Sequence, residues 1–414
     1  MESSFAPSVA PASPARWHRR VLTLAFPIVL ANLTQPILSA VDTAVAGHLP
    51  GPEYIGGVAL GGVFFNFVFW GFGFLRMGTT GLVSQAHGAG DTQALRASVV
   101  RALLLAFAIG AVLLVLQVPA IRITLALLGA SESVTRMAEV YCHTRIWSAP
   151  FALANYVVLG TLLGRQQVRR ALLLQVFINT VNMLAVLTLV LGARMGVGGI
   201  GAATALADIA GFGLGMLLLW LQRPTGLPPL TRAELLARNA WRRLMGLNTD
   251  IFLRTLCLLA AFGWFAHAGA RQGDVVLAAN ALLLNFLTFM AYGLDGFAHA
   301  AVALVGAGII GMLTDQAAVR EAARHYLVWA ALLPIVSVWG FQFDGVFIGA
   351  TRTRELLVTM AVAAAAFLGL SVTLQPLWGN HGLWLSMLGF MALRGLMLGV
   401  LLPRVWRAPE LQAA

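Results

Sequence analysis

The sequence of 414 residues contains no lysine, and charged residues of all kinds make up only 10% of it. Hydrophobic residues make up 59% and the mean hydropathy is +0.83, which excludes an ordinary soluble domain. The apolar residues come in blocks of about twenty, long enough to cross a hydrocarbon core as helices. Segments such as 102–121 are apolar on every side, which excludes the alternating strands of a membrane β-barrel. We therefore predict an all-α, polytopic membrane protein.

Cysteine and enzyme motifs are also scarce. The two cysteines, Cys142 and Cys257, both fall in apolar segments, so neither a disulfide framework nor a metal site is expected. The sequence has no HExxH, no GxSxG, no phosphate-binding loop and no cluster of cysteine and histidine. These absences argue against an enzyme and against ATP-driven pumping. We expect no catalytic residues, no metal and no cofactor, apart from a coupling ion that is either a proton or a sodium ion.

Turn signals between the apolar blocks divide the chain into two halves. The N-lobe, 17–222, follows a short disordered tail at 1–16. Its six predicted spans are 21–47, 54–85, 98–121, 138–163, 171–192 and 199–221. A stretch rich in proline and arginine, 223–247, is predicted to be a linker with an amphipathic helix at the membrane surface. The C-lobe, 248–407, then has five or six spans and ends in a tail at 408–414. Two pseudo-symmetric helical lobes around a central cleft are the expected architecture.

Arginine predicts the orientation of the chain in the membrane. Alternate polar segments carry most of the basic residues of the first half and the linker: the N-terminal tail, the loops near Arg96 and Arg165, and the linker itself. Cytoplasmic loops of membrane proteins carry such an excess, so the N-terminus and the linker are predicted to be cytoplasmic, in a cell inner membrane. The net charge of +11 therefore reflects membrane topology and not a nucleic-acid partner. We expect the lipid bilayer and small organic substrates as partners of a monomer.

The second half repeats the first with a gap. LLGASESVTRMAEVY (127–141) aligns with MLTDQAAVREAARHY (312–326) at an offset of 185, whereas the second and eighth predicted helices align at an offset near 222. The second half thus lacks about 37 residues, which correspond to a ninth helix, and is shortened near 303–312. With eleven spans the last arginine-rich loops fall outside the cell. Alternatively, 277–313 forms two short pieces, 277–292 and 296–313, which restores the parity.

Asp42 is a carboxylate inside an apolar run. A charge at the bilayer centre is costly, so such a carboxylate faces a wet cavity or carries a proton, as a proton-coupled carrier requires. Pro27 and Pro36 lie in the same predicted helix, where each removes a backbone donor and favours a bent, hydrated face. We predict that Asp42 couples ion movement to transport and that the prolines bend its helix.

Further polar residues interrupt the other spans. Asn179 and Asn182 lie one turn apart and either bond helices together or join Asp42 in a coupling network. Asp208 favours a structural role because glycine and alanine flank it. Arg394 is expected to pair or to reach the interface. The residues predicted to line a substrate cleft are Asn32, Gln35, Asn155, Asp295 and Asp344, although Asp295 and Asp344 fit hydrogen bonding between helices equally well.

The chain resembles the multidrug and toxic compound extrusion (MATE) family, in its DNA-damage-inducible F-like (DinF) branch. The stretches that carry the resemblance are FPIVLANLTQPILSAVDTAVAGHL, GLNTDIFLRTL, FMAYGLDGFAHA, FDGVFIGATRTRE and GNHGLWL. The resemblance implies export of organic, often cationic compounds in exchange for protons or sodium ions. It also implies that Asp42 binds the coupling proton, that its helix bends at Pro27, and that Asn182 belongs to the same network. Two departures are Val186, where the family often has an aspartate, and the missing ninth helix.

Two readings of function remain open from the sequence. The first is a secondary active efflux antiporter in which Asp42 exchanges a proton. The second is a degenerate pseudo-transporter that keeps the fold without completing transport, as Val186 and the gap of about 37 residues suggest. A lipid carrier is a weaker third reading, because such a cleft needs several buried cations and the sequence indicates few.

Overall fold

The computed structural model describes residues 41–42, 44–222, 228–292 and 316–406. These residues form helices joined by short turns, without a β-strand among them. Eight helical stretches in these ranges are long and apolar enough to cross a membrane. Large apolar side chains cover much of their outer surface, and Val115, for example, is 80% exposed. Such exposure suits lipid as the solvent. The chain is thus an all-α, multi-pass membrane protein, as predicted.

The N-lobe is a bundle of eight α-helices within the described residues. Their bounds are α2 Pro52–Gly71, α3 Phe74–Gly88, α4 Thr92–Val115, α5 Gln117–Leu128, α6 Glu132–Arg145, α7 Ala149–Gly164, α8 Val168–Val186 and α9 Gly196–Trp220. The short helix η1, Ile146–Ser148, joins α6 to α7, and a π-helical turn, η2, Leu187–Gly192, extends α8. Residues 41, 42 and 44–47 are also helical and bring Asp42 into this lobe. The sequence-predicted spans from 54 onward all fall on these helices.

The C-lobe contains fewer and longer helices. They are α11 Arg238–Ala270, α12 Asp274–Tyr292, α14 Ala317–Gly349 and α15 Thr353–Trp406. Gly379 interrupts α15 with φ +56°, a backbone conformation that favours glycine, so α15 consists of two helices that meet at this residue. Five helices are therefore described in this half, and α12 is not among the described stretches that are long enough to cross a membrane. Of the two alternative pieces near the gap, α12 covers 277–292, while 296–313 and the shortened region near 303–312 lie outside the described residues.

The linker is shorter than predicted. A four-residue helix, α10 Arg232–Leu235, begins with a capping box in which Thr231 and Glu234 satisfy each other's backbone N–H groups. The helix α11 then begins at Arg238, inside the predicted linker 223–247, and absorbs most of the expected amphipathic segment. No proline or glycine lies between Arg238 and Met245 to prevent a helix there, whereas Pro228 and Pro229 precede α10.

Each lobe has its own hydrophobic core. In the N-lobe, Phe64, Phe65 and Tyr141 pack in a cluster that continues into α11 through Leu247 and Ile251. The C-lobe core is separate and gathers its large side chains from α11, α12, α14 and α15: Phe265, Leu283, Leu333, Phe367, Trp384 and Phe390. Two cores predict two bodies that can move relative to each other.

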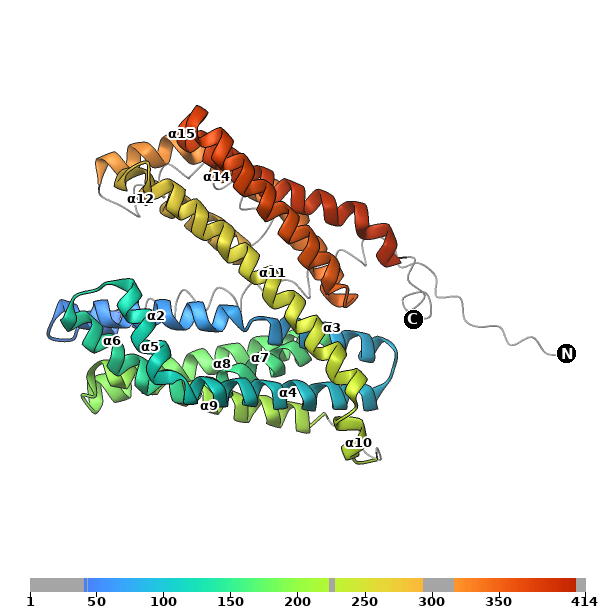
Figure 1. Ribbon diagram of the computed structural model, residues 1–414. Helices are drawn as coiled ribbons and strands as arrows, with labels where there is room; N and C mark the ends of the chain where they lie inside the picture. The colour runs from blue at the N-terminus through green and yellow to red at the C-terminus, as the bar shows by residue number, and fades with distance from the viewer. Residues whose placement is uncertain (1–40, 43, 223–227, 293–315, 407–414) are drawn as a thin grey trace.

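The lobes meet mainly where α11 and α14 lie against α3, and Figure 1 shows them diverging away from this end, which is also the end that carries α10. Two glycines of α3 allow the close approach. A Cβ atom at Gly81 would lie 2.5 Å from the main-chain oxygen of Ile348, and one at Gly78 would lie 2.2 Å from Asn248 Oδ1. The contact between the lobes therefore depends on the absence of side chains at these positions.

Candidate functional site

Asp42 lies in the N-lobe, and one of its two carboxylate oxygens has no hydrogen-bond partner among the described residues. The residue is half-buried, and its Oδ1 atom is buried without accepting a hydrogen bond from the described residues. A buried polar atom without a partner costs free energy and is therefore uncommon in native structures. As far as the described residues show, this oxygen is available to take a proton or to bind a ligand.

Arg145 supplies the positive charge near Asp42. It ends α6, and its Nη1 donates to the Tyr141 hydroxyl at 2.6 Å. Its guanidinium carbon lies 4.4 Å from the centre of the Phe65 ring, a distance at which a cation is attracted to an aromatic face. Its charge interacts with those of Asp42 and Asp208, although it forms no described ion pair with either. Arg145 thus packs against aromatic side chains and lies near two carboxylates.

Asp208, on α9, belongs to the same neighbourhood. Its Oδ2 accepts a hydrogen bond from Ser148 Oγ at 2.8 Å. Its main-chain oxygen accepts one from Asn155 Nδ2 at 2.9 Å, so that residue ties α7 to α9 and is only 4% exposed. Asp208 therefore bonds neighbouring helices together, which is a structural role, and it also lies near Arg145.

Asn182 bonds across helices to the same face of α9. Its Nδ2 donates to Thr204 Oγ1 at 3.0 Å, and Thr204 lies one turn before Asp208. The side chain of Asn182 is 1% exposed, and its Oδ1 is buried without a described partner. Asn179 accepts from Gln175 within α8. Val186, one turn after Asn182, is completely buried in the apolar core and contributes no polar atom.

These contacts define the N-lobe polar cluster, whose members come from six segments of the chain. They are Asp42, Tyr141, Arg145, Ser148, Asn155, Asn182, Thr204 and Asp208. With two carboxylates and one guanidinium, its charge is −1 when all three are ionised. One proton taken up by a carboxylate neutralises the cluster. The cluster is therefore neutral with one bound cation and negatively charged without it. An ion-coupling site needs this kind of reversible charge change.

The C-lobe contains a second buried charge cluster. Oδ2 of Asp344, on α14, accepts hydrogen bonds from Nη2 of Arg254, on α11, and from Nη2 of Arg394, on α15. Their side chains are 9%, 7% and 1% exposed. This placement differs from the cleft-lining position expected for Asp344 and matches the alternative of bonding between helices. The expected pairing of Arg394 is observed.

The other sequence-predicted residues lie outside the described part of the chain. They are Pro27, Asn32, Gln35, Pro36 and Asp295. Sequence reasoning missed Tyr141, Arg145 and Arg254. Arg145 could have been found, because it falls inside the predicted span 138–163, where an arginine is as unusual as an aspartate. The structure also corrects the premise of few intramembrane cations, since Arg145, Arg254 and Arg394 all lie within spans, each near a carboxylate.

The described residues contain no group of three or more potential metal-binding side chains. The arrangement within those ranges thus offers proton exchange and hydrogen bonding as its chemistry, with carboxylate and amide oxygens as the groups available to an alkali cation.

Known proteins share both sequence and fold with the chain. The family model described as MatE matches residues 27–216. DNA damage-inducible protein F of Escherichia coli K12 is 41% identical and covers 95% of this chain and 92% of its own length. A probable multidrug resistance protein NorM of Geobacillus kaustophilus is 24% identical, with 95% and 96% covered. The fold matches a multidrug resistance MATE family transporter of the MOP superfamily in an outward-facing conformation, with a TM-score of 0.79 at 18% identity over 95% and 96% of the chains.

The alignment with the Escherichia coli protein also concerns the predicted gap. It extends over 438 positions, more than the 414 residues of this chain, so the relative has residues without a counterpart here. Their location stays a prediction. The members of this family are transporters and not enzymes, and the identity to protein F extends over nearly the whole chain. The chain belongs to the MATE family of efflux transporters, in the DinF branch.

Proposed function

We propose that this protein is a secondary active antiporter that exports organic, cationic or amphipathic compounds across the inner membrane in exchange for protons, with sodium ions as the alternative coupling ion. The observation that carries the proposal is a buried carboxylate oxygen of Asp42 that has no hydrogen-bond partner among the described residues and lies near the Arg145 guanidinium. A carboxylate in this position gains or loses a proton with a large change in its electrostatic interactions, because the surroundings are apolar.

Arg145 couples the protonation of Asp42 to the position of the helix that carries Asp42. When Asp42 is ionised, attraction to Arg145 favours its carboxylate near α6. When Asp42 is protonated, Arg145 is left to Asp208 alone, and the helix that carries Asp42 is free to move away. The relatives' names, multidrug resistance proteins among them, support organic compounds as the cargo. An ionised Asp42 attracts a cationic compound, and its protonation favours release.

Alternating access follows from the two separate cores. The lobes are in contact at the end that carries α10 and diverge at the other end. If the linker is cytoplasmic, as the arginine distribution predicts, this arrangement is the one that releases cargo outside. The return step separates α3 from α11 and α14, and it also moves Leu247 and Ile251 of α11 away from the N-lobe core. We retain a cytoplasmic N-terminus and a monomer as proposals.

Ethidium efflux from cells under an imposed pH gradient tests the proposal. Cells that express the wild type are compared with cells that express Asp42→Asn, which removes the exchangeable proton at constant size. Asp274→Asn is the matched control, because Asp274 is exposed at the start of α12. We expect efflux that follows the gradient in the wild type and control and is lost in Asp42→Asn. Absence of efflux from all three, with each protein present in the membrane, would instead support the pseudo-transporter.

A further inference from the structure

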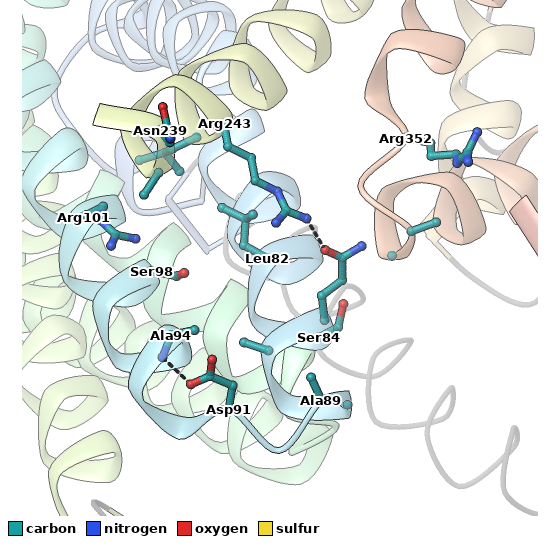
Figure 2. A pocket seen from close by; sticks show the side chains of 17 residues that line it. Leu82, Ser84, Ala89, Asp91, Ala94, Ser98, Arg101, Asn239, Arg243 and Arg352 are labelled. Carbon is teal, nitrogen blue, oxygen red and sulfur yellow. Dashed lines mark hydrogen bonds between the residues drawn. The ribbon is translucent and has the colours of Figure 1, made fainter. Parts of the chain in front are cut away.

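A pocket at the end that carries α10 is separate from the N-lobe polar cluster. Its volume is about 790 Å³, in the range of small-molecule sites. Figure 2 shows its walls, which come from the end of α3, the first half of α4, the start of α11 and the turn after α14. The first two belong to the N-lobe, and the last belongs to the C-lobe, so the pocket lies between the lobes.

Three arginines line this pocket: Arg101, Arg243 and Arg352. The one carboxylate among its lining residues is Asp91, whose Oδ1 is occupied as the N-cap of α4 and accepts from Ala94 N at 2.8 Å. If all four groups are ionised, the lining carries a charge of +2. An anion is attracted to the guanidinium groups in this lining.

Carboxylates outside the lining lie near two of these arginines, Glu234 near Arg101 and Glu355 beside Arg352, whereas the hydrogen bonds of Arg243 go to neutral groups. Arg101 donates to the main-chain oxygens of Glu234 at 2.7 Å and Leu235 at 3.3 Å, which are neutral groups. The Glu234 carboxylate lies near Arg101 but is bonded to Thr231 and Gln93.

Arg243 likewise has neutral partners. Its Nη2 donates to Gln85 Oε1 at 2.6 Å and lies 3.4 Å from Thr351 Oγ1. It thereby joins α3 of the N-lobe to the C-lobe turn. Of the three arginines, Arg352 has a carboxylate partner, Glu355, at 3.0 Å.

The walls also leave room for a ligand. Gly88 and Gly349 are lining residues, and a Cβ atom built on either of them would meet no atom within 4 Å. Each planar guanidinium group can donate two parallel hydrogen bonds to the oxygens of one phosphate group. Ser98 adds a hydroxyl group to the same lining, whereas the Ser84 hydroxyl donates to the main-chain oxygen of Gly81 at 2.9 Å.

We propose that this pocket binds a phosphate-bearing anion and that the bound anion stabilises the contact between the lobes at this end. Both lobes contribute arginines, so the anion bridges them only while they are together. Ligand binding to one conformation shifts the population toward it. The anion therefore slows the opening of this end and the return step of transport. The phosphate comes either from a lipid headgroup or from a soluble phosphate compound.

The melting temperature of the purified full-length protein in nanodiscs distinguishes these sources. In one arm, inorganic pyrophosphate is titrated onto protein in phosphatidylcholine nanodiscs. In the other, phosphatidylglycerol replaces phosphatidylcholine in increasing fractions. A ligand that binds the folded state raises the melting temperature with its concentration. Stabilisation in the first arm indicates a soluble anion, and stabilisation confined to the second indicates a lipid headgroup.

Arg243→Gln and Arg352→Gln test the pocket, with Arg170→Gln as the matched control. Arg170 is exposed in the first turn of α8, at the same end of the N-lobe, and does not line the pocket. We expect each pocket variant to weaken the binding that stabilises the protein by about tenfold or more, because a charge-assisted hydrogen bond is lost. The control should bind as the wild type does.

Gly81→Ala tests the requirement for both lobes without changing an arginine. Its Cβ would lie 2.5 Å from Ile348 O, so α3 and α14 must separate. We expect weaker binding in this variant too, provided that it elutes as a folded protein. No stabilisation in either arm, or equal stabilisation of Arg243→Gln and Arg170→Gln, would overturn the proposed site. Undiminished binding by Gly81→Ala would overturn the link to the closed lobes.

Discussion

Replacement of Asp344 by asparagine removes the one carboxylate that joins Arg254 and Arg394. The change keeps the size of the side chain and leaves two buried guanidinium groups, 7% and 1% exposed, facing each other without a counter-ion. Breaking a buried ion pair by removing one partner costs about 3–5 kcal/mol in protein interiors. Three helices, α11, α14 and α15, lose their common bond at once. We expect Asp344→Asn to lower the free energy of unfolding by about this amount.

The unfolding of purified protein in detergent, followed by the fluorescence of its tryptophans, measures this loss. Glu132→Gln is the control, because the pair of Glu132 with Arg136 is 91% and 69% exposed and contributes about 0–1 kcal/mol. A triple variant with apolar residues at 254, 344 and 394 should recover much of the loss, since no buried charge remains. A loss below about 1 kcal/mol in Asp344→Asn would refute the reasoning that the triad clamps the C-lobe.

Two further predictions concern packing. Gly110→Ala places a Cβ 2.4 Å from Pro150 Cα and should destabilise the N-lobe by about 1–3 kcal/mol, whereas Gly62→Ala, with no atom within 4 Å, should be neutral or stabilising in the same unfolding assay. Asn280→Leu removes the amide that exchanges two hydrogen bonds of 2.8 Å with Asn380 and accepts a third from Trp384. The free energy of unfolding should therefore fall by about 3 kcal/mol, and the melting temperature should fall with it. An unchanged melting temperature contradicts this account.

The spans were predictable from the sequence because each is a long apolar block, and the block alone decides that a helix crosses the membrane. Asp42 was predictable as a candidate for the same reason: it interrupts such a block. Its surroundings were not predictable in this way. Tyr141 and Arg145 reach Asp42 from α6, about 100 residues later in the chain, and no local pattern records that proximity.

The C-lobe shows the same limit of local patterns. Asp344 stood out in the sequence as a charge in an apolar helix, and its two partners lie 90 and 50 residues away. A search for acidic residues alone left it open whether Asp344 lines the cleft or bonds helices together. A search that counted arginines within spans as well would have indicated that acids and bases balance, which favours ion pairs between helices.

The length of the linker depended on a different kind of information. Its composition predicted a separate surface helix, and the arginines near 238–243 supported that interpretation. In the structure these residues begin α11, and Arg243 uses its charged end to bond both lobes. A helix that continues into the membrane and one that stops at its surface share the same local sequence pattern, so tertiary contacts decide between them.

Transport by purified protein in proteoliposomes tests most directly whether Asp42 couples cargo to an ion. Ethidium movement is followed with a proton gradient in sodium-free buffer, with a sodium gradient at equal pH on both sides, and with no gradient. The account predicts movement driven by one of the two gradients in the wild type and its loss in Asp42→Asn. Movement that is the same with and without the gradients, or that persists in Asp42→Asn, would contradict it.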